Sequence, residues 1–165
     1  MNSKPYYTAY EDRYRAVYDA GIGLWGNSAE DKALRDTLAA WVTSNDLRGK
    51  RVIDFACGEG SCGLLLTSLG CMYLGVDISP SALDNARKRL ADCKDAELRL
   101  LDIVKDTTGE VFDAAIDVMG FHMLVTDDDR RAYLDNVAVS SDPARRCCLS
   151  VRLIVRMPMK ARSAR

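Results

Sequence analysis

The sequence contains little of what metal, membrane or export functions require. Histidine occurs once, and the six cysteines include no CxxC spacing, so the closely spaced ligands of a structural zinc site are missing. No stretch approaches the roughly 18 consecutive apolar residues of a membrane helix. The first ten residues lack the apolar centre of a signal peptide. We therefore expect no metal, no membrane partner, and a cytoplasmic protein whose cysteines are small reduced thiols.

An excess of charge of one sign is also missing from the chain as a whole. Its 165 residues, about one domain, hold 23 Lys+Arg and 24 Asp+Glu. Because nucleic-acid binders need a basic field, we expect no nucleic-acid partner. The balance is nevertheless uneven: residues 1–139 hold 16 basic and 23 acidic residues, whereas residues 140–165 hold seven and one. The last segment is therefore a different kind of sequence.

Helix and strand patterns alternate from residue 51 onward. The first part of the chain predicts two helices, one over 6–20 with tyrosines at every fourth position and one from Ser28 to about Thr43. Alternation after that predicts an α/β fold, a doubly wound parallel sheet with helices on both faces and a ligand site beyond the carboxyl ends of the strands. The predicted strands are 51–56, 72–76, 98–101 and 112–118, and the predicted helices are 61–69, 79–92 and 126–139.

Three glycines follow the first predicted strand. Gly58, Gly60 and Gly63 match the GxGxxG pattern, in which glycines let the backbone approach a nucleotide. Asp54 ends the strand before them, where a carboxylate would repel a diphosphate and would suit a positively charged ligand. The alternative interpretation is that the glycines only form a tight turn between strand and helix.

Acidic residues also end the next three predicted strands. Asp77 follows Gly58 by 19 residues, at a spacing where a carboxylate can accept both hydroxyls of a ribose. Asp102 and Asp117 end the third and fourth strands. Acids at successive strand ends favour a ligand site, while Asp102 taken singly is equally consistent with a solvated loop.

These motifs resemble those of the class I S-adenosyl-L-methionine (SAM)-dependent methyltransferases of the small-molecule type. The resemblance implies SAM as cofactor and a Rossmann-like sheet of strand order 3-2-1-4-5. It places Asp54 and the glycine loop at the methionine end of the cofactor, with Ala56 where many members have glycine. The cofactor-binding residues that it implies are Trp25, Asp54, Ala56, Gly58, Gly60, Asp77, Ile78, Asp102, Ile103 and Asp117.

The resemblance also implies roles for individual side chains. Asp102 would accept the adenine amino group with Ile103 on the ring, and Asp117 would lie beside the transferable methyl group. His122 follows in a similar motif and has two interpretations, a base that takes a proton from the acceptor or a packed structural histidine. The tyrosine helix likewise is either a lid, with Trp25 as a lid contact, or plain packing.

Methyl transfer requires mainly that the acceptor be aligned with the methyl carbon. We therefore predict a methyltransferase with a small-molecule methyl acceptor, a pocket roofed by N-terminal helices, and Asp117 and His122 as catalytic residues. Two alternatives stay open. One is an NAD(P)-dependent oxidoreductase that uses the GxGxxG loop, and the other is a non-catalytic protein that binds SAM or its demethylated product, S-adenosylhomocysteine.

The resemblance divides the chain into three parts. Residues 1–46 are expected to form the helical lid, residues 47–139 the SAM-binding core, and residues 140–165 an atypical basic tail with an edge strand within 148–156. In the family, a buried fifth strand and a hairpin follow the last helix, and the tail does not match that pattern. We expect a truncated or frame-shifted ending without the final β-hairpin. The edge of the sheet would then be exposed, and two copies of the chain would be able to pair there as a homodimer.

Overall fold

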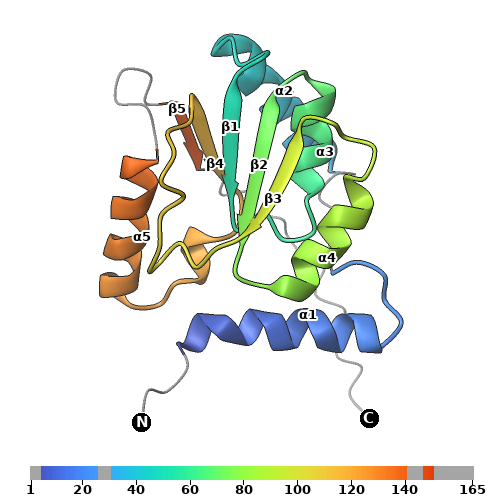
Figure 1. Ribbon diagram of the computed structural model, residues 1–165, viewed down its shortest axis with the longest axis vertical. Helices are drawn as coiled ribbons and strands as arrows, with labels where there is room; N and C mark the ends of the chain where they lie inside the picture. The colour runs from blue at the N-terminus through green and yellow to red at the C-terminus, as the bar shows by residue number, and fades with distance from the viewer. Residues whose placement is uncertain (1–4, 26–30, 141–146, 151–165) are drawn as a thin grey trace, which may run out of the picture.

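Parallel strands form the centre of the fold (Figure 1). A computed structural model of the chain describes residues 5–25, 31–140 and 147–150. Its strands lie in the order β3-β2-β1-β4-β5, and every neighbouring pair is parallel. The predicted α/β sheet and its strand order are therefore confirmed. The strands are β1 (Arg51–Phe55), β2 (Met72–Asp77), β3 (Ala96–Leu100), β4 (Ala114–Asp117) and β5 (Cys147–Ser150).

Helices cover both faces of this sheet, with α2, α3 and α4 on one side and α5 on the other (Figure 1). The first helix, α1, lies across the carboxyl ends of the strands, the edge at which the sequence predicts the ligand site. The helices are α1 (Ala9–Asp19), α2 (Lys32–Ser44), α3 (Ser61–Ser68), α4 (Pro80–Arg89) and α5 (Asp127–Val139), with short 3-10 helices η1 (Tyr6–Thr8) and η3 (Phe121–Met123).

The strand register brings the predicted acids to one edge. Phe55, the last residue of β1, pairs with Val76 of β2 and with Asp117 of β4. Asp77 follows Val76 and pairs with the last residue of β3, Leu100. The carboxylates that end these strands therefore face the same space, although they are far apart in the sequence.

Side-chain caps explain where the helices begin. Ser79 accepts a hydrogen bond from the Ala82 amide at 3.1 Å, with proline at the first position of α4, as the sequence predicts. The beginning of α2 differs from the prediction. It starts at Lys32, because the Asp31 carboxylate accepts hydrogen bonds from the Ala33 and Leu34 amides, and the expected cap Ser28 lies outside the described residues.

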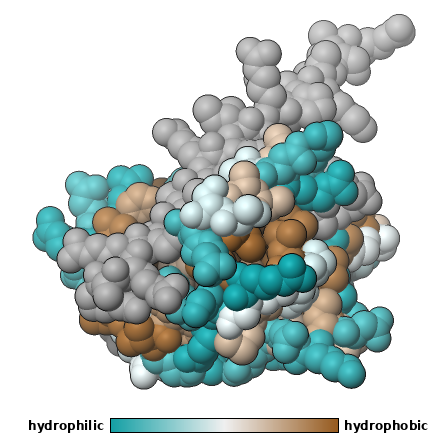
Figure 2. Space-filling view, turned by 90° about the horizontal axis from the view of Figure 1, so that it is seen from above, coloured by the Kyte–Doolittle hydropathy of each residue, from teal (hydrophilic) through white to brown (hydrophobic). Residues whose placement is uncertain are grey.

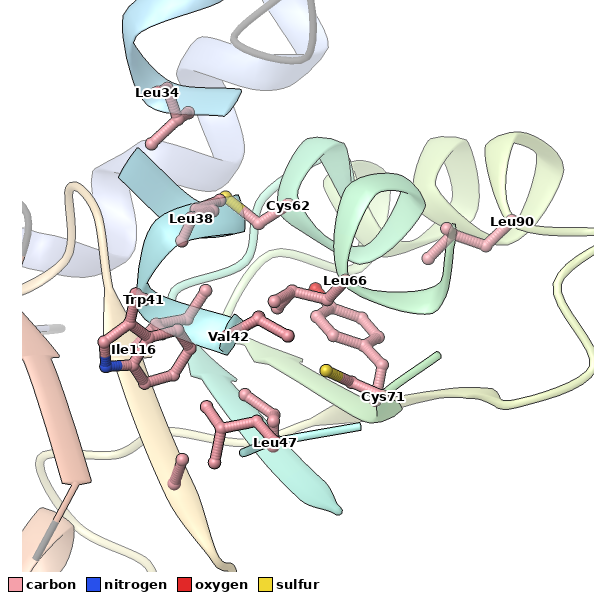
Figure 3. Close-up of a cluster of buried hydrophobic side chains, with 13 residues drawn as sticks. Leu34, Leu38, Trp41, Val42, Leu47, Cys62, Leu66, Cys71, Leu90 and Ile116 are labelled. Atoms are coloured by element: carbon pink, nitrogen blue, oxygen red, sulfur yellow. The ribbon is translucent and has the colours of Figure 1, made fainter. Parts of the chain in front are cut away.

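A hydrophobic core lies between the sheet and the helices α2 and α3 (Figure 3). Leu38 of α2 and Leu66 of α3 are completely buried there, together with Val52 of β1. A second cluster covers the opposite face of the sheet, where Phe55 and Phe112 meet Tyr133 of α5. Helix α2 is thus part of the main core and packs beside α3.

At the end of the molecule opposite α1, hydrophilic and hydrophobic residues both reach the described surface (Figure 2). None of the helices in the described ranges has the length and apolar character of a membrane span. The cysteines whose side chains are described, Cys57, Cys62, Cys71 and Cys93, are free thiols. Most of the expected basic tail lies outside the described residues, which do not include 141–146 and 151–165. The expectation of a missing β-hairpin falls on this same part of the chain.

Candidate functional site

A cavity of about 470 Å³ lies between the carboxyl ends of the strands and α1. Its lining combines the predicted motif loops with side chains of η1 and α1. Gly60, Asp117 and His122, also predicted for the site, are not among its lining residues. The predicted site residues that the structure brings together around it are Trp25, Asp54, Ala56, Gly58, Asp77, Ile78, Asp102 and Ile103.

The loop after β1 requires glycine at two positions. Gly58 and Gly60 have φ angles of 53° and 73°, in the left-handed region that favours glycine. A Cβ atom on Gly58 would lie 2.7 Å from the Tyr14 hydroxyl oxygen, so a side chain at this position would require Tyr14 to move. Ala56, where the family often has glycine, also has a left-handed φ of 55°, which costs an alanine about 1 kcal/mol.

Asp54 is a buried acid at the wall of the cavity. Its carboxyl group accepts a hydrogen bond from the Tyr73 hydroxyl at 2.8 Å. Burial is the main cause that raises the pKa of Asp54 to about 8; the Tyr73 hydrogen bond opposes this shift, and the nearby carboxylates of Asp117 and Asp77 add to it. A positively charged group in the cavity would favour ionisation of this acid. The position therefore suits a cationic ligand.

Asp77 joins two of the motif loops. Its two carboxylate oxygens accept hydrogen bonds of 2.8 Å from the amides of Gly58 and Ser79. Burial raises its pKa, while these amide hydrogen bonds oppose the shift. Because each carboxylate oxygen has a second lone pair, Asp77 can also accept hydroxyl groups of a ligand.

Asp102 is held at the end of β3 by several contacts. It accepts hydrogen bonds from the Val104 amide at 3.2 Å and the Tyr7 hydroxyl at 3.3 Å, and it forms an ion pair with Lys105 at 3.0 Å. The side chain is only 15% exposed, so it is not a freely solvated loop acid. Ile103, beside it, lines the cavity.

Asp117 organises the turn after β4. It accepts hydrogen bonds from the Gly120 amide at 2.8 Å and the Phe121 amide at 2.9 Å, and another from the Tyr133 hydroxyl. Burial raises the pKa of Asp117, and the charge of His122 is one of the influences that lower it. His122 itself is exposed, so the interpretation as a packed core histidine is wrong. Tyr133, rather than either predicted residue, lines the cavity here.

The predicted tyrosine stripe is divided in the structure. Tyr10 and Tyr14 line the cavity, and the ring of Tyr14 lies 5.0 Å from that of Trp25. Tyr6 instead accepts a hydrogen bond from the amide of Val125, and the buried tyrosine of this segment is Tyr7. The helix begins only at Ala9, after a 3-10 turn, so the four-residue periodicity does not extend to the first tyrosine.

Several residues of the site were not predicted from the sequence. Their function is to hold the predicted acids or the helix above them, which only the folded arrangement reveals. One sequence signal existed for Glu59, which lies between the two glycines of the loop and is buried. The unpredicted residues are Tyr7, Glu11, Glu59, Tyr73 and Tyr133.

In the described ranges, no group of three or more histidine, cysteine or acidic side chains has an arrangement that could hold a metal ion. The cavity itself presents acids, aromatic rings and a glycine loop to a ligand. The acids and the glycine loop lie at or after the ends of successive parallel strands, the usual ligand position in such folds, whereas Tyr10 and Tyr14 come from α1.

Comparison with known proteins identifies the family. The family described as "Methyltransferase domain" matches residues 52–143, more than half of the chain. The ribosomal protein L11 methyltransferase of Vibrio campbellii is 46% identical over 77 residues, which cover 46% of this chain and 25% of that protein. The chain thus spans about a quarter of the length of the first curated relatives that it matches.

Solved structures agree with this assignment. A TehB-like SAM-dependent methyltransferase from Corynebacterium glutamicum is 26% identical, with a TM-score of 0.54 over 84% of this chain and 68% of that chain. The DhpI-SAM-HEP complex shares the fold, with a TM-score of 0.67 and 21% identity over 87% of this chain and 64% of that chain. The chain belongs to the methyltransferase domain family.

Proposed function

We propose that the protein is a SAM-dependent methyltransferase that acts on a small-molecule acceptor. The observation that carries this proposal is the single cavity in which Asp54, Asp77 and Asp102, from the ends of three successive strands, meet the glycine loop. A ligand with a positive charge, a ribose and an adenine matches these groups in order along the sheet edge.

The residues of the cavity fit SAM. The buried carboxyl of Asp54 would face the cationic methionine end, and Asp77 would accept the ribose hydroxyls with oxygens that already hold the glycine loop. Asp102 and Ile103 would receive the adenine, and Ile78 would pack beside it. A side chain at Gly58 would require Tyr14 to move, and glycine at this position is expected of a loop that passes beside a ligand.

SAM supplies an electrophilic methyl group on a sulfonium, and the protein has to align an acceptor with it. Asp117 would act from the end of β4, where it holds the turn that contains Gly120 and Phe121. His122 lies in this same turn, exposed and outside the lining of the cavity, and is the candidate group for taking a proton from an acceptor that extends to this turn. The aromatic rings of Tyr10 and Tyr14 above the cavity favour a cation by their π faces.

The shape and wall of the cavity support a small acceptor. One wall is apolar, with Met119, Met123 and Leu124 beyond the end of β4, and α1 covers the cavity across the carboxyl ends of the strands (Figure 1). Among the structural neighbours, CalS10 is described as an amino pentose methyltransferase. The curated relatives are methyltransferases of a ribosomal protein, so the size of the acceptor is the property to test.

Calorimetric titration with SAM, S-adenosylhomocysteine and NAD tests the cofactor. We expect wild type and Asp84→Ala to bind SAM, and Asp77→Ala to bind at least tenfold more weakly, because it loses a buried charged hydrogen-bond acceptor. Asp84 is a matched control, since it is an exposed acid on α4 outside this cavity. Circular dichroism checks that each variant is folded. Binding of NAD without binding of SAM would favour the oxidoreductase alternative.

Transfer of a labelled methyl group tests the acceptor. Wild type is incubated with methyl-labelled SAM and cell extract separated into small-molecule and macromolecular fractions. We expect label in the small-molecule fraction and none with Asp77→Ala. Label only in the protein fraction would contradict the small acceptor, and SAM binding without transfer to either fraction would favour the non-catalytic alternative.

A further inference from the structure

Polar contacts tie the N-terminal segment to each of three motif loops. The Tyr7 hydroxyl donates to Asp102 after β3, the Glu11 carboxylate accepts from Ser79 after β2, and the Tyr18 hydroxyl donates to Glu59 after β1. Helix α1 has no buried side chain of its own. These polar contacts add to the packing of its half-buried tyrosine rings, and they reach the loops that the proposed function assigns to the cofactor.

Glu11 connects α1 to the beginning of α4. Its carboxylate accepts hydrogen bonds of 2.6 Å from the hydroxyls of both Ser79 and Ser81, and one of 3.2 Å from the Ser81 amide. Burial opposes ionisation of Glu11, yet these hydrogen bonds outweigh it and lower its pKa. The charge lies at the N-terminus of α4, where the helix dipole favours an anion.

Glu59 connects the loop after β1 to the N-terminal segment that contains α1. One of its carboxylate oxygens accepts hydrogen bonds of 2.8 Å from both the Tyr18 hydroxyl and the Trp25 amide. The side chain is 6% exposed and belongs to the loop between Gly58 and Gly60. One buried carboxylate thus joins the glycine loop to the end of α1 and to the segment that follows it.

We propose that Glu11 and Glu59 are positioning residues that form a clasp, closing α1 over the bound cofactor and setting how fast it leaves. The proposal rests on the proposed function. Tyr10 and Tyr14 lie on α1 between Tyr7 and Tyr18 and line the cavity. A closed clasp therefore keeps these rings over the ligand, and cofactor exchange requires at least part of the clasp to open.

A simple capping role for Glu11 does not explain the arrangement. Helix α4 already has its own cap, since Ser79 accepts a hydrogen bond from the Ala82 amide. Glu59 lies at the other end of α1 and caps no helix there, yet it makes the equivalent connection. If Glu11 only stabilised α4, its loss would lower the melting temperature without changing the release of cofactor.

Stopped-flow release of S-adenosylhomocysteine, the demethylated product, tests the clasp in the full chain. We expect Glu11→Ala and Tyr18→Phe each to release it about tenfold faster than wild type, because each loses hydrogen bonds to a charged group. Tyr18→Phe weakens the Glu59 contact without altering the glycine loop. Asp12→Ala is the matched control, an exposed acid next to Glu11 on the same helix, and we expect its rate within twofold of wild type.

Two further measurements separate the clasp from loss of folding. Glu11→Gln keeps an acceptor for the serine hydroxyls, so its release rate should fall between those of wild type and Glu11→Ala. Hydrogen exchange of the α1 amides should be faster in Glu11→Ala than in Asp12→Ala. Equal release rates in Glu11→Ala, Tyr18→Phe and Asp12→Ala would overturn the clasp while leaving SAM binding intact. A wild type that binds neither SAM nor S-adenosylhomocysteine would overturn the proposed function itself.

Discussion

The two N-terminal helices differ in what holds them to the molecule. In α2, four side chains are buried in the main core: Leu34, Leu38, Trp41 and Val42. Helix α1 buries none, and the contacts that hold it include hydrogen bonds through Glu11 and Tyr18 to the loops beyond the strands. Apolar burial fixes α2 to the sheet, whereas α1 is held by half-buried tyrosine rings and by polar contacts to the loops.

This difference separates stability from the proposed function within one segment. The expectation for residues 1–46 treats both helices as a lid. In the structure, α1 lies across the carboxyl ends of the strands, while α2 packs beside α3 against the face of the sheet and contributes Leu34 to the lining of the cavity. We therefore expect changes in α2 to act on folding and changes in α1 to act on ligand exchange.

The largest expected effect is in α2. Leu38→Ala should lower the free energy of unfolding by about 2–5 kcal/mol, because Leu38 is completely buried and its truncation leaves a cavity. Urea denaturation measures this change. Asp12→Ala in α1, an exposed position, should change it by less than about 0.5 kcal/mol. Similar losses in both variants would contradict the distinction between the two helices.

The next effect concerns Asp54, the buried acid at the wall of the cavity. The pKa of Asp54 is raised to about 8 in the folded protein by burial, against roughly 3.9 in the unfolded chain. Between these values the unfolded chain loses the proton first, so this group lowers stability as pH rises from about 4 to 8. Asp54→Asn removes that dependence. Its free energy of unfolding should therefore rise relative to that of wild type by about 1 kcal/mol for each unit of increasing pH in this range.

Denaturation at several pH values from 5 to 8 measures this difference. Asp77 and Asp117 also have raised pKa values and remain in both proteins, so the comparison with wild type measures Asp54 together with its electrostatic coupling to these two acids. Asp84→Asn, an exposed change of the same kind, should run parallel to wild type. Parallel curves for Asp54→Asn as well would show that Asp54 ionises normally. The site would then carry no cost to stability, and the contrast with α2 would be weaker.

The smallest expected effect is in the glycine loop. Ala56→Gly should raise the free energy of unfolding by about 0.5–1 kcal/mol, because it relieves an alanine in the left-handed region at the cost of a more flexible unfolded chain. The same substitution at the exposed Ala40 in α2 should instead lower it by about 1 kcal/mol. Thermal unfolding of both variants tests whether the signs are opposite.

Much of the fold could be read from the sequence because local chemistry decides it. The alternation of strands and helices predicts the parallel sheet, the family resemblance implies its strand order, and the caps at Ser79 and Thr126 predict where α4 and α5 begin. The start of α2 was missed because two candidate caps, Ser28 and Asp31, compete, and local sequence does not choose between them.

The candidate site was predicted less completely. Acids and glycines at strand ends are visible one by one, since each follows an apolar run. Their partners, such as Tyr73 on Asp54 and Tyr133 on Asp117, are 19 and 16 residues away from them. No periodicity within a single element connects residues at these distances. The exposure of His122 likewise depends on how the turn after β4 lies on the surface.

The sequence by itself determined the parallel sheet, the glycine loop and the acids at its strand ends, because hydrophobic periodicity and glycine's conformational freedom act over a few residues. Only the tertiary structure decided which helix covers the cavity and which belongs to the core. That choice depends on contacts between segments far apart in the chain, such as Glu11 with Ser81, whose hydrogen bonds form only after the sheet has brought the loops together.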